Sequence, residues 1–269
     1  MLSKEFRLDL EALLSQIVDG RGFLHYGYWN DGRADEISLR SLGAAQQAYF
    51  DQLLSAIPGG TRSILDVGSG TGSNALRLLQ NNYSVDCVCP SPRLNEIARR
   101  KLPRGTRIFE CAFEELATDK VYDLLLFSES FHYLDAARAL RRIAVHAKKH
   151  VLIFDYFPRQ DSATGRAVSR SQFLRLATDS LSGTFEIAGD RDVTGFIIPT
   201  FRVLDEIKNE YVRPFVIRSV AEFRKEHGVY SRLLSYPLRR LLASFEKSSN
   251  RYRTFPETYE YRLMVLART

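Results

Sequence analysis

Residues 63–79, SILDVGSGTGSNALRLL, constrain the fold of this chain more than any other stretch. An apolar run from Ser63 to Val67 leads into three glycines and then into apolar residues at helical spacing. Glycines let the backbone adopt unusual dihedral angles and approach a ligand closely. The helix that follows points its free N–H groups at that ligand. The stretch therefore predicts the first strand, turn and helix of an open α/β sheet, with a binding site at the turn.

The glycine spacing excludes two common phosphate-binding turns. No Gly-Lys-Ser/Thr is present, so the stretch is not a P-loop, and Ser73 stands where a dinucleotide fingerprint needs its third glycine. The observed Asp-x-Gly-x-Gly-x-Gly pattern resembles motif I of the class I methyltransferases that depend on S-adenosylmethionine (SAM). The resemblance implies that SAM is the cofactor and that its methionine half lies at the turn. The positions so implied are Asp66, Gly68, Ser69, Gly70, Thr71 and Asn74.

The resemblance covers residues 24–158 and extends to a final strand at 259–266. It implies an α/β fold, a doubly wound Rossmann-like seven-stranded sheet, mostly parallel with an antiparallel last strand, plus N-terminal helices and a helical cap. Further strands are expected at 83–89, 107–111, 122–127, 150–157 and 184–188. We expect four segments: an N-terminal helical and aromatic lid segment (1–60), a SAM-binding core (61–158), a mostly helical cap and substrate region (159–256) and the last core strand (257–269).

An aromatic segment lies between two predicted N-terminal helices, at 3–19 and 41–56. Its sequence, His25-Tyr26-Gly27-Tyr28-Trp29, resembles a His-x-Gly-Tyr-Trp segment that closes over SAM in several small-molecule methyltransferases. Tyr26 and Tyr28 are candidate cofactor contacts, because a ring face attracts a sulfonium by about 1–2 kcal/mol when water is excluded. The alternative is that the rings only pack the N-terminal helix onto the core.

The adenosine side departs from the family pattern at two positions. Cys89 stands where the family has the acidic residue that binds both ribose hydroxyls, and a thiol cannot accept two hydrogen bonds as a carboxylate does. Ala112 stands where the family has an Asp that reaches the adenine amino group. The resemblance then implies that Ser91 or backbone groups hold the ribose and that Phe113 flanks the adenine.

The loop after the fourth strand, Ser128 to Leu134, is expected to face the reacting centre, because ligands bind at the carboxyl ends of the strands. It has neither the Asn/Asp-Pro-Pro-Tyr/Phe sequence of amino-group nucleic-acid methyltransferases nor a Pro-Cys nucleophile, which argues against base methylation. Ser128 and Glu129 are candidate cofactor contacts. An O- or N-nucleophile loses a proton as it accepts a methyl group, so acid/base residues are needed. The candidate catalytic residues are His132, Glu129, Tyr26 and Tyr156; for His132 the alternative is a structural hydrogen bond at a helix start.

The composition argues against other classes of protein. Among the 269 residues no apolar run approaches the roughly 20 that a membrane span requires, and the N-terminus does not read as a signal peptide. We expect a cytoplasmic protein. Its three cysteines, Cys87, Cys89 and Cys111, predict reduced core thiols rather than a disulfide framework, and no metal site is expected.

The net charge of +6 arises largely after residue 210. A basic surface of this kind suits either an anionic partner such as RNA or the solvated face of basic helices; the absence of a dense Lys/Arg block favours the second, so nucleic acid is not expected as a partner. Aromatic residues of the cap suit either an apolar substrate or helix packing. They are Phe196, Phe201, Tyr211, Phe215 and Tyr230.

Three functions follow as hypotheses. The first is methyl transfer from SAM to an oxygen or nitrogen of a small molecule, as in small-molecule biosynthesis. The second uses SAM as the sole substrate and cyclises its aminobutyrate part to azetidine-2-carboxylate, releasing methylthioadenosine, as some methyltransferase-like proteins do. The third is a non-catalytic SAM- or RNA-binding protein, which rests only on the basic charge.

Overall fold

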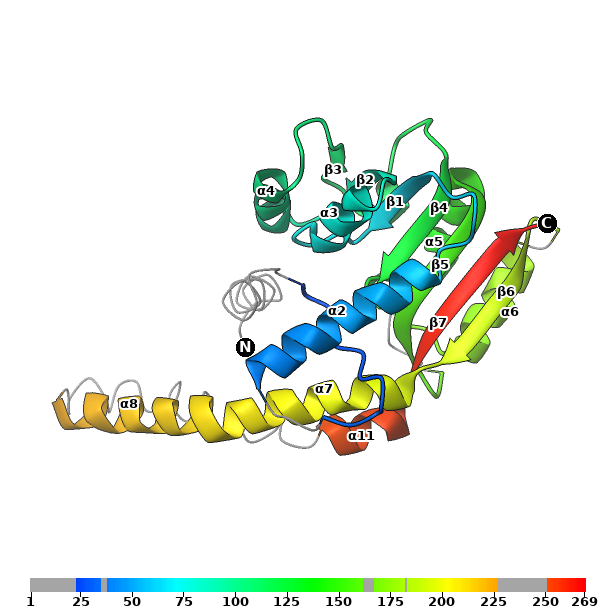
Figure 1. Cartoon of the computed structure of the whole chain (residues 1–269). Helices are drawn as coiled ribbons and strands as arrows, with labels where there is room; N and C mark the ends of the chain where they lie inside the picture. Colours follow the sequence, from blue (N-terminus) through cyan, green and yellow to red (C-terminus); the bar gives the residue numbers. More distant parts are fainter. Residues whose placement is uncertain (1–22, 35–37, 162–166, 182, 227–250) are drawn as a thin grey trace.

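The computed structural model describes residues 23–34, 38–161, 167–181, 183–226 and 251–269. Within these residues a single sheet has the strand order β3-β2-β1-β4-β5-β7-β6 (Figure 1). β7 is antiparallel to both of its neighbours, and the other strand pairs are parallel. The predicted fold class is therefore confirmed. The strands are β1 (Ser63–Val67), β2 (Ser84–Val88), β3 (Ile108–Phe109), β4 (Tyr122–Ser128), β5 (Ala147–Pro158), β6 (Phe185–Asp192) and β7 (Tyr259–Arg268).

Helices cover both faces of the sheet because alternate residues of the central strands are apolar on both sides. Leu124 and Leu126 of β4 pack under one set of helices, whereas Leu125 and Phe127 pack under the other. The first set is α2 (Leu39–Ser55), α3 (Ser73–Gln80), α4 (Pro92–Lys101), α7 (Thr194–Ile207) and α11 (Arg251–Thr258); the second is α5 (Ala136–His146) and α6 (Arg170–Leu181). The short helices η1 (Phe113–Glu115) and η2 (Phe131–Tyr133) follow β3 and β4.

Polar caps explain where several helices begin. Ser38 forms a capping box with Ser41 at the start of α2, and Asp135 accepts the backbone N–H of Arg138 at the start of α5. Ser91 caps α4 in the same way, with Pro92 at the first helical position.

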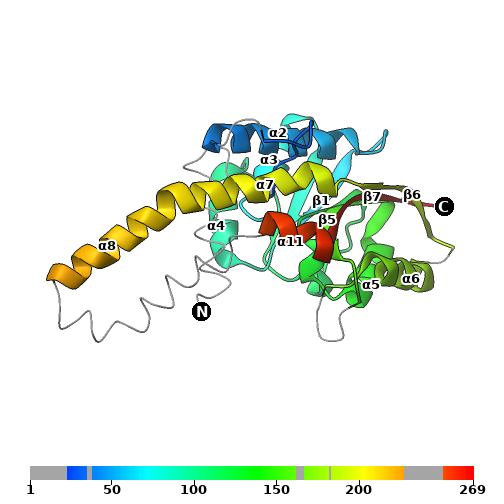
Figure 2. The same ribbon diagram turned by 90° about the horizontal axis from the view of Figure 1, so that it is seen from below.

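One long helical segment runs through Pro199 and Pro214, although the sequence predicts that a proline interrupts a helix. α7, the π-helix η3 (Lys208–Val212) and α8 (Arg213–Glu226) follow one another without a gap, and α8 projects from the body (Figure 2). Pro199 lies inside α7, where burial of the helix face compensates for one lost hydrogen bond. The wider π-turn immediately before Pro214 relieves the clash between a proline ring and the preceding turn.

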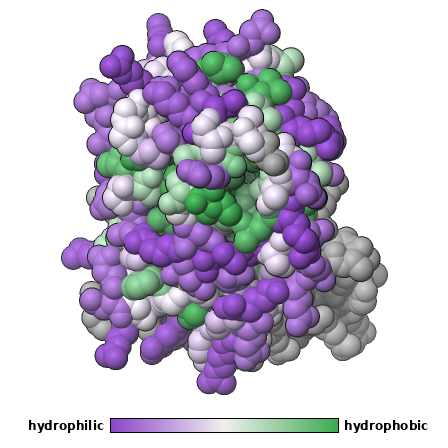
Figure 3. Space-filling model, turned by 90° about the vertical axis from the view of Figure 1, so that its right-hand side faces the viewer, coloured by the Kyte–Doolittle hydropathy of each residue, from purple (hydrophilic) through white to green (hydrophobic). Residues whose placement is uncertain are grey.

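The segment expected to form the cap also contributes to the core. β6 forms an edge of the sheet, and α6 packs beside α5 under the second face. Seen from the side of β6 and the C-terminus, the surface is mostly hydrophilic around a small apolar patch (Figure 3). Among the described residues, no helix is long and apolar enough to cross a membrane. The expected helix at 3–19 and Tyr230 lie outside the described residues.

Candidate functional site

The glycine turn between β1 and α3 is shaped for close approach of a ligand. Gly68, Gly70 and Gly72 have φ angles of 73°, 55° and 75°, which favour glycine. A Cβ atom on Gly68 would lie 2.4 Å from Cβ of Ser130, and one on Gly70 would lie 3.1 Å from Cδ1 of Leu24. The turn is therefore enclosed by the loop after β4 on one side and by the N-terminal segment on the other.

Polar side chains around this turn contain buried atoms that no described residue satisfies. Oδ2 of Asp66, Oγ of Ser69 and Oδ1 of Asn74 have no hydrogen-bond partner. Asp66 is only 1% exposed, and burial raises the pKa of its carboxyl group to about 7. Buried polar atoms are normally hydrogen-bonded, so three such oxygens beside a glycine turn indicate a site for a polar ligand that brings its own donors. Thr71 lies in the same turn, where its hydroxyl is 3.1 Å from that of Ser73.

The loop after β4 lies directly against the turn. Ser130 donates a hydrogen bond to the Val67 carbonyl at 2.5 Å. The hydroxyl of Ser128 accepts from Nδ2 of Asn74 at 3.2 Å, which joins the two predicted cofactor contacts. Glu129 has a φ of 51° without being glycine, and such backbone strain is often found at functional sites.

The N-terminal segment 23–29, which we call the lid, covers this region. The backbone N–H of Tyr26 donates to Oε1 of Glu129 at 2.7 Å. The His25 ring stacks on Tyr49 with ring centroids 4.1 Å apart and lies beside Asn74. Burial lowers the pKa of His25 to about 4, so this ring is neutral at pH 7.

The far end of the lid belongs to the packing between helices. Tyr28 is buried and stacks on Phe196 of α7 at 4.9 Å, while Nε1 of Trp29 donates to the Thr200 hydroxyl at 2.9 Å. The structure therefore brings Tyr26 to the site but places the Tyr28 ring against α7. Tyr28 and Trp29 therefore follow the packing alternative, whereas the cofactor contact of Tyr26 stays a prediction.

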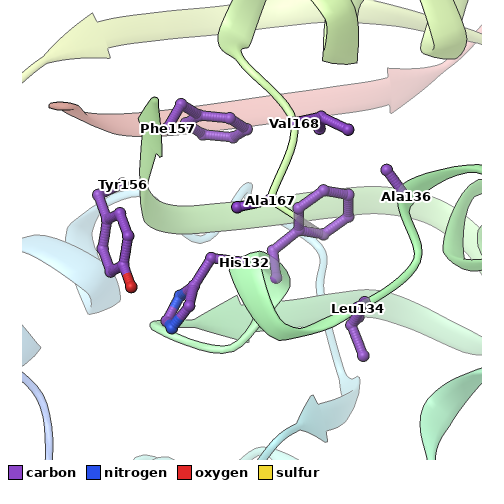
Figure 4. Close-up of a pocket in the computed structure, with 8 residues that line it drawn as sticks. His132, Leu134, Ala136, Tyr156, Phe157, Ala167 and Val168 are labelled. Atoms are coloured by element: carbon purple, nitrogen blue, oxygen red, sulfur yellow. The ribbon is translucent and has the colours of Figure 1, made fainter. Parts of the chain in front are cut away.

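His132 forms a pair with Asp155 at the carboxyl end of β5. Nδ1 of His132 lies 2.8 Å from Oδ1 of Asp155, and the backbone N–H of His132 donates to Oδ2 at 3.1 Å. Asp155 is fully buried, and Nε2 of His132 has no partner among the described residues. The side chains of His132 and Tyr156 point the same way, away from Leu134 and Ala136 (Figure 4), with ring centroids 4.2 Å apart. A cavity of about 10 Å³ lined by these residues has room for little more than one water molecule.

Six aromatic side chains lie together beside this pair, and we call them the aromatic cluster. Neighbouring rings in it have centroids 4.6 to 6.4 Å apart. The cluster is Tyr26, Tyr156, Phe201, Phe255, Tyr259 and Tyr261, from the lid, β5, α7, α11 and β7.

The adenosine-side candidates line the edge formed by β2 and β3. The Cys89 thiol is buried and faces backbone N–H groups of Gly70 and Ser91. Ala112 precedes η1, and the ring of Phe113 is buried edge-on to Phe127. The Phe113 ring is therefore part of the core, which leaves its backbone as the group available to a ligand.

Sequence reasoning missed the role of Tyr261 and the pairing of Asp155 with His132. The position of Asp155 near the carboxyl end of a predicted strand, next to Tyr156, predicts only that it lines the substrate side. Tyr261 gave no local signal, because its hydroxyl donates to Oε1 of Glu129, 132 residues away in the sequence.

Comparison with known proteins agrees with this geometry. A family model described as "Methyltransferase domain" matches residues 64–150. An uncharacterized methyltransferase of Mycobacterium tuberculosis is 32% identical over 88 residues, which are 33% of this chain and 36% of that protein. A cypemycin N-terminal methyltransferase of Streptomyces is 28% identical over 163 residues, 58% of this chain and 61% of that protein. The chain thus matches only about a third of the length of the first curated relatives.

Solved structures share the fold over almost the whole chain. The geranyl diphosphate C-methyltransferase of Streptomyces coelicolor superposes with a TM-score of 0.68 at 16% identity, covering 96% of this chain and 92% of that one. The (4+2)-cyclase SpnF superposes with a TM-score of 0.67 at 19% identity, covering 99% and 97%. At these identities the likeness shows the fold. The matches around residues 64–150 confirm the predicted resemblance to class I SAM-dependent methyltransferases.

Proposed function

We propose that this methyltransferase-family protein transfers the methyl group of SAM to a hydroxyl or amino group of a small molecule, with His132 as the general base. The observation that carries the proposal is the buried His132–Asp155 pair at the carboxyl ends of β4 and β5. It supplies a proton acceptor in the place where the fold family holds its reacting atoms.

The residues around the glycine turn fit SAM. Asp66, Ser69 and Asn74 offer unsatisfied buried oxygens to the amino group and hydroxyls of a ligand, and the glycines leave room for it. When bound, SAM supplies an electrophilic methyl group on a sulfonium. Ser128 lies at the methionine end in this proposal, and Cys89, Ser91, Ala112 and Phe113 at the adenosine end.

Asp155 prepares His132 for proton transfer. With Oδ1 of Asp155 accepting from Nδ1–H, the lone pair of the neutral ring is on Nε2, the nitrogen that lacks a partner. The carboxylate also stabilises the imidazolium that forms when Nε2 accepts the acceptor's proton. Because methyl transfer is a direct displacement, alignment and exclusion of water supply the rest of the rate enhancement.

The aromatic cluster supports an apolar acceptor. Tyr156 contacts both His132 and the cluster, so an acceptor held against these rings would place its nucleophile beside Nε2. Ring faces and edges favour flat apolar molecules over highly charged ones. Tyr26 and Tyr156 are in this proposal positioning residues of the acceptor side.

The test is methyl transfer from isotopically labelled SAM to a panel of phenols, catechols and aryl amines. We expect His132→Gln to lower kcat by roughly 10²- to 10⁴-fold, the usual contribution of a general base. Asp155→Asn lowers it too, because the amide no longer fixes the tautomer of His132. SAM affinity, measured by calorimetry, stays within about threefold because neither side chain borders the glycine turn.

The matched control is His150→Gln, at the opposite end of β5. It should leave both kcat and SAM affinity unchanged. Transfer at the wild-type rate by His132→Gln would remove His132 from the mechanism.

A further inference from the structure

Glu129 occupies a junction between four parts of the fold. Its Oε1 accepts hydrogen bonds from the backbone N–H of Tyr26 in the lid and from the hydroxyl of Tyr261 in β7. We propose that Glu129 is a positioning residue that fastens the lid over the glycine turn and thereby sets the rate at which the cofactor binds and leaves. The identity of that cofactor as SAM rests on the proposed function.

The lid is attached at two ends with different kinds of contact. At its far end, the Thr200 hydroxyl accepts hydrogen bonds from Gly27 N–H at 3.0 Å and Trp29 Nε1 at 2.9 Å, and Tyr28 stacks on Phe196. These groups tie the segment to α7. At its near end, the contact from Tyr26 N–H to Glu129 at 2.7 Å ties the segment to the loop after β4. Nε2 of Gln46 in α2 also donates to the carbonyls of His25 and Phe23 at 2.8 and 3.4 Å. A hydrogen bond to a carboxylate is stronger than these neutral ones, so removal of Glu129 should loosen this end of the lid.

Glu129 itself is rigidly held. Its backbone N–H donates to the Phe154 carbonyl at 3.0 Å and keeps the residue at a φ of 51°. Tyr261 OH, 2.6 Å from Oε1, is also 3.2 Å from Tyr49 OH, which donates to the Phe154 carbonyl. Burial and the carboxylate of Glu129 raise the pKa of Tyr261 well above its usual value, so the phenol remains a donor. A left-handed conformation costs a non-glycine residue about 1 kcal/mol or more, and this network compensates for that cost.

Fastening the lid closes the region that the cofactor must cross. Leu24 stands over Gly70, and His25 lies between Tyr49 and the side chain of Asn74. A ligand at the glycine turn is therefore covered while Tyr26 N–H is bonded to Glu129. The same carboxylate oxygen serves both donors, which assigns Glu129 to holding the lid and leaves proton transfer to His132.

Two measurements on the variants Glu129→Ala and Tyr261→Phe test the proposal. Hydrogen exchange of the peptide covering residues 23–29, measured by mass spectrometry on the protein alone, reports lid opening. Stopped-flow dissociation of SAM reports its release. Loss of a hydrogen bond to a charged group predicts that Glu129→Ala speeds both processes by roughly 10- to 100-fold. Tyr261→Phe keeps the ring and removes one donor, so an increase of about 3- to 10-fold is expected.

Glu186→Gln is the control, because Glu186 is an exposed carboxylate on β6 that pairs with Ala267, at the opposite end of β7 from Tyr261. Unchanged exchange at residues 23–29 in both variants would overturn the proposal. Faster SAM release with unchanged exchange would also overturn it, since Glu129 would then contact the cofactor rather than hold the lid. The exchange readout needs no cofactor, so it separates failure of this inference from failure of the proposed function. If Glu129→Ala does not fold, the same two measurements on Tyr261→Phe test the proposal.

Discussion

The two sides of the proposed site are built in opposite ways. The proposed cofactor side comes largely from consecutive residues 63–91, and its buried oxygens on Asp66, Ser69 and Asn74 lack partners among the described residues. The acceptor side is assembled from rings that range from Tyr26 to Tyr261, and those rings pack against one another. A site made from one local stretch can be recognised in a sequence, whereas a site assembled by tertiary packing cannot. Unsatisfied polar atoms mark the first side, and mutual ring contacts mark the second.

The largest loss of stability on the proposed cofactor side is expected from Gly68→Ala. The new Cβ would lie 2.4 Å from Cβ of Ser130, whose hydroxyl is bound to the Val67 carbonyl, and φ at this position is 73°. Overpacking together with the backbone strain should reduce the free energy of unfolding by about 3–4 kcal/mol. Urea denaturation followed by circular dichroism measures this loss. Gly59→Ala, with no atom within 4 Å of its Cβ, should change stability by less than about 0.5 kcal/mol; equal losses in the two variants would refute the steric argument.

A smaller effect should follow from releasing the lid from α7 with Thr200→Val. Valine has nearly the shape of threonine but cannot accept from Gly27 N–H and Trp29 Nε1, which then remain buried without a partner. We expect a loss of about 2 kcal/mol in the free energy of unfolding and a red-shifted or broadened Trp29 fluorescence signal. Trp29 is the single tryptophan, so the signal is specific. Thr200→Ser keeps the hydroxyl and should recover most of the loss; a serine variant as unstable as valine would point to packing instead.

The smallest effect concerns the charge of Asp66. Burial raises its pKa in the cofactor-free protein to about 7, so its ionised fraction rises from about a tenth at pH 6 to about nine tenths at pH 8. The ionised form attracts a cationic cofactor, so SAM affinity should increase by up to about tenfold over this interval. Asp66→Asn should remove that dependence, as measured by calorimetry at each pH. A pH profile shared by both proteins would assign the titration to another group.

The same pKa shift affects stability in the opposite direction. A carboxyl whose folded-state pKa lies above its unfolded value of 3.8 binds a proton more tightly when folded. The cofactor-free protein therefore loses stability as the pH rises from about 4 to about 7, and Asp66→Asn should lack this loss.

Most of the fold could be predicted because its signals are local. β1 was expected at 63–67 and is found there, and the alternation of strands and helices up to residue 158 follows the apolar spacing. β5 begins at Ala147 rather than 150, because Ala147 pairs with Tyr122 of β4, and Lys148 and Lys149 fall within the register shift before His150 pairs with Leu124. The helix through Pro199 and Pro214 was missed because tertiary burial and a π-turn overcame local propensity.

The candidate site was predictable only in part for the same reason. The glycine turn and His132 stand in recognisable local contexts. The role of Glu129 depends on Tyr26 and Tyr261, which are 103 and 132 residues away. The placement of Tyr28 against Phe196 likewise depends on a helix that lies far along the chain.

The most direct test of the account is to incubate the pure protein with SAM alone, to measure binding by calorimetry and to follow the products by mass spectrometry. The proposed methyl transfer predicts saturable binding of SAM at one site and no change in the SAM itself, because transfer requires an acceptor beside His132. Formation of methylthioadenosine with azetidine-2-carboxylate would contradict it and identify SAM as the sole substrate. Absence of SAM binding would contradict the proposal that the glycine turn is a cofactor site.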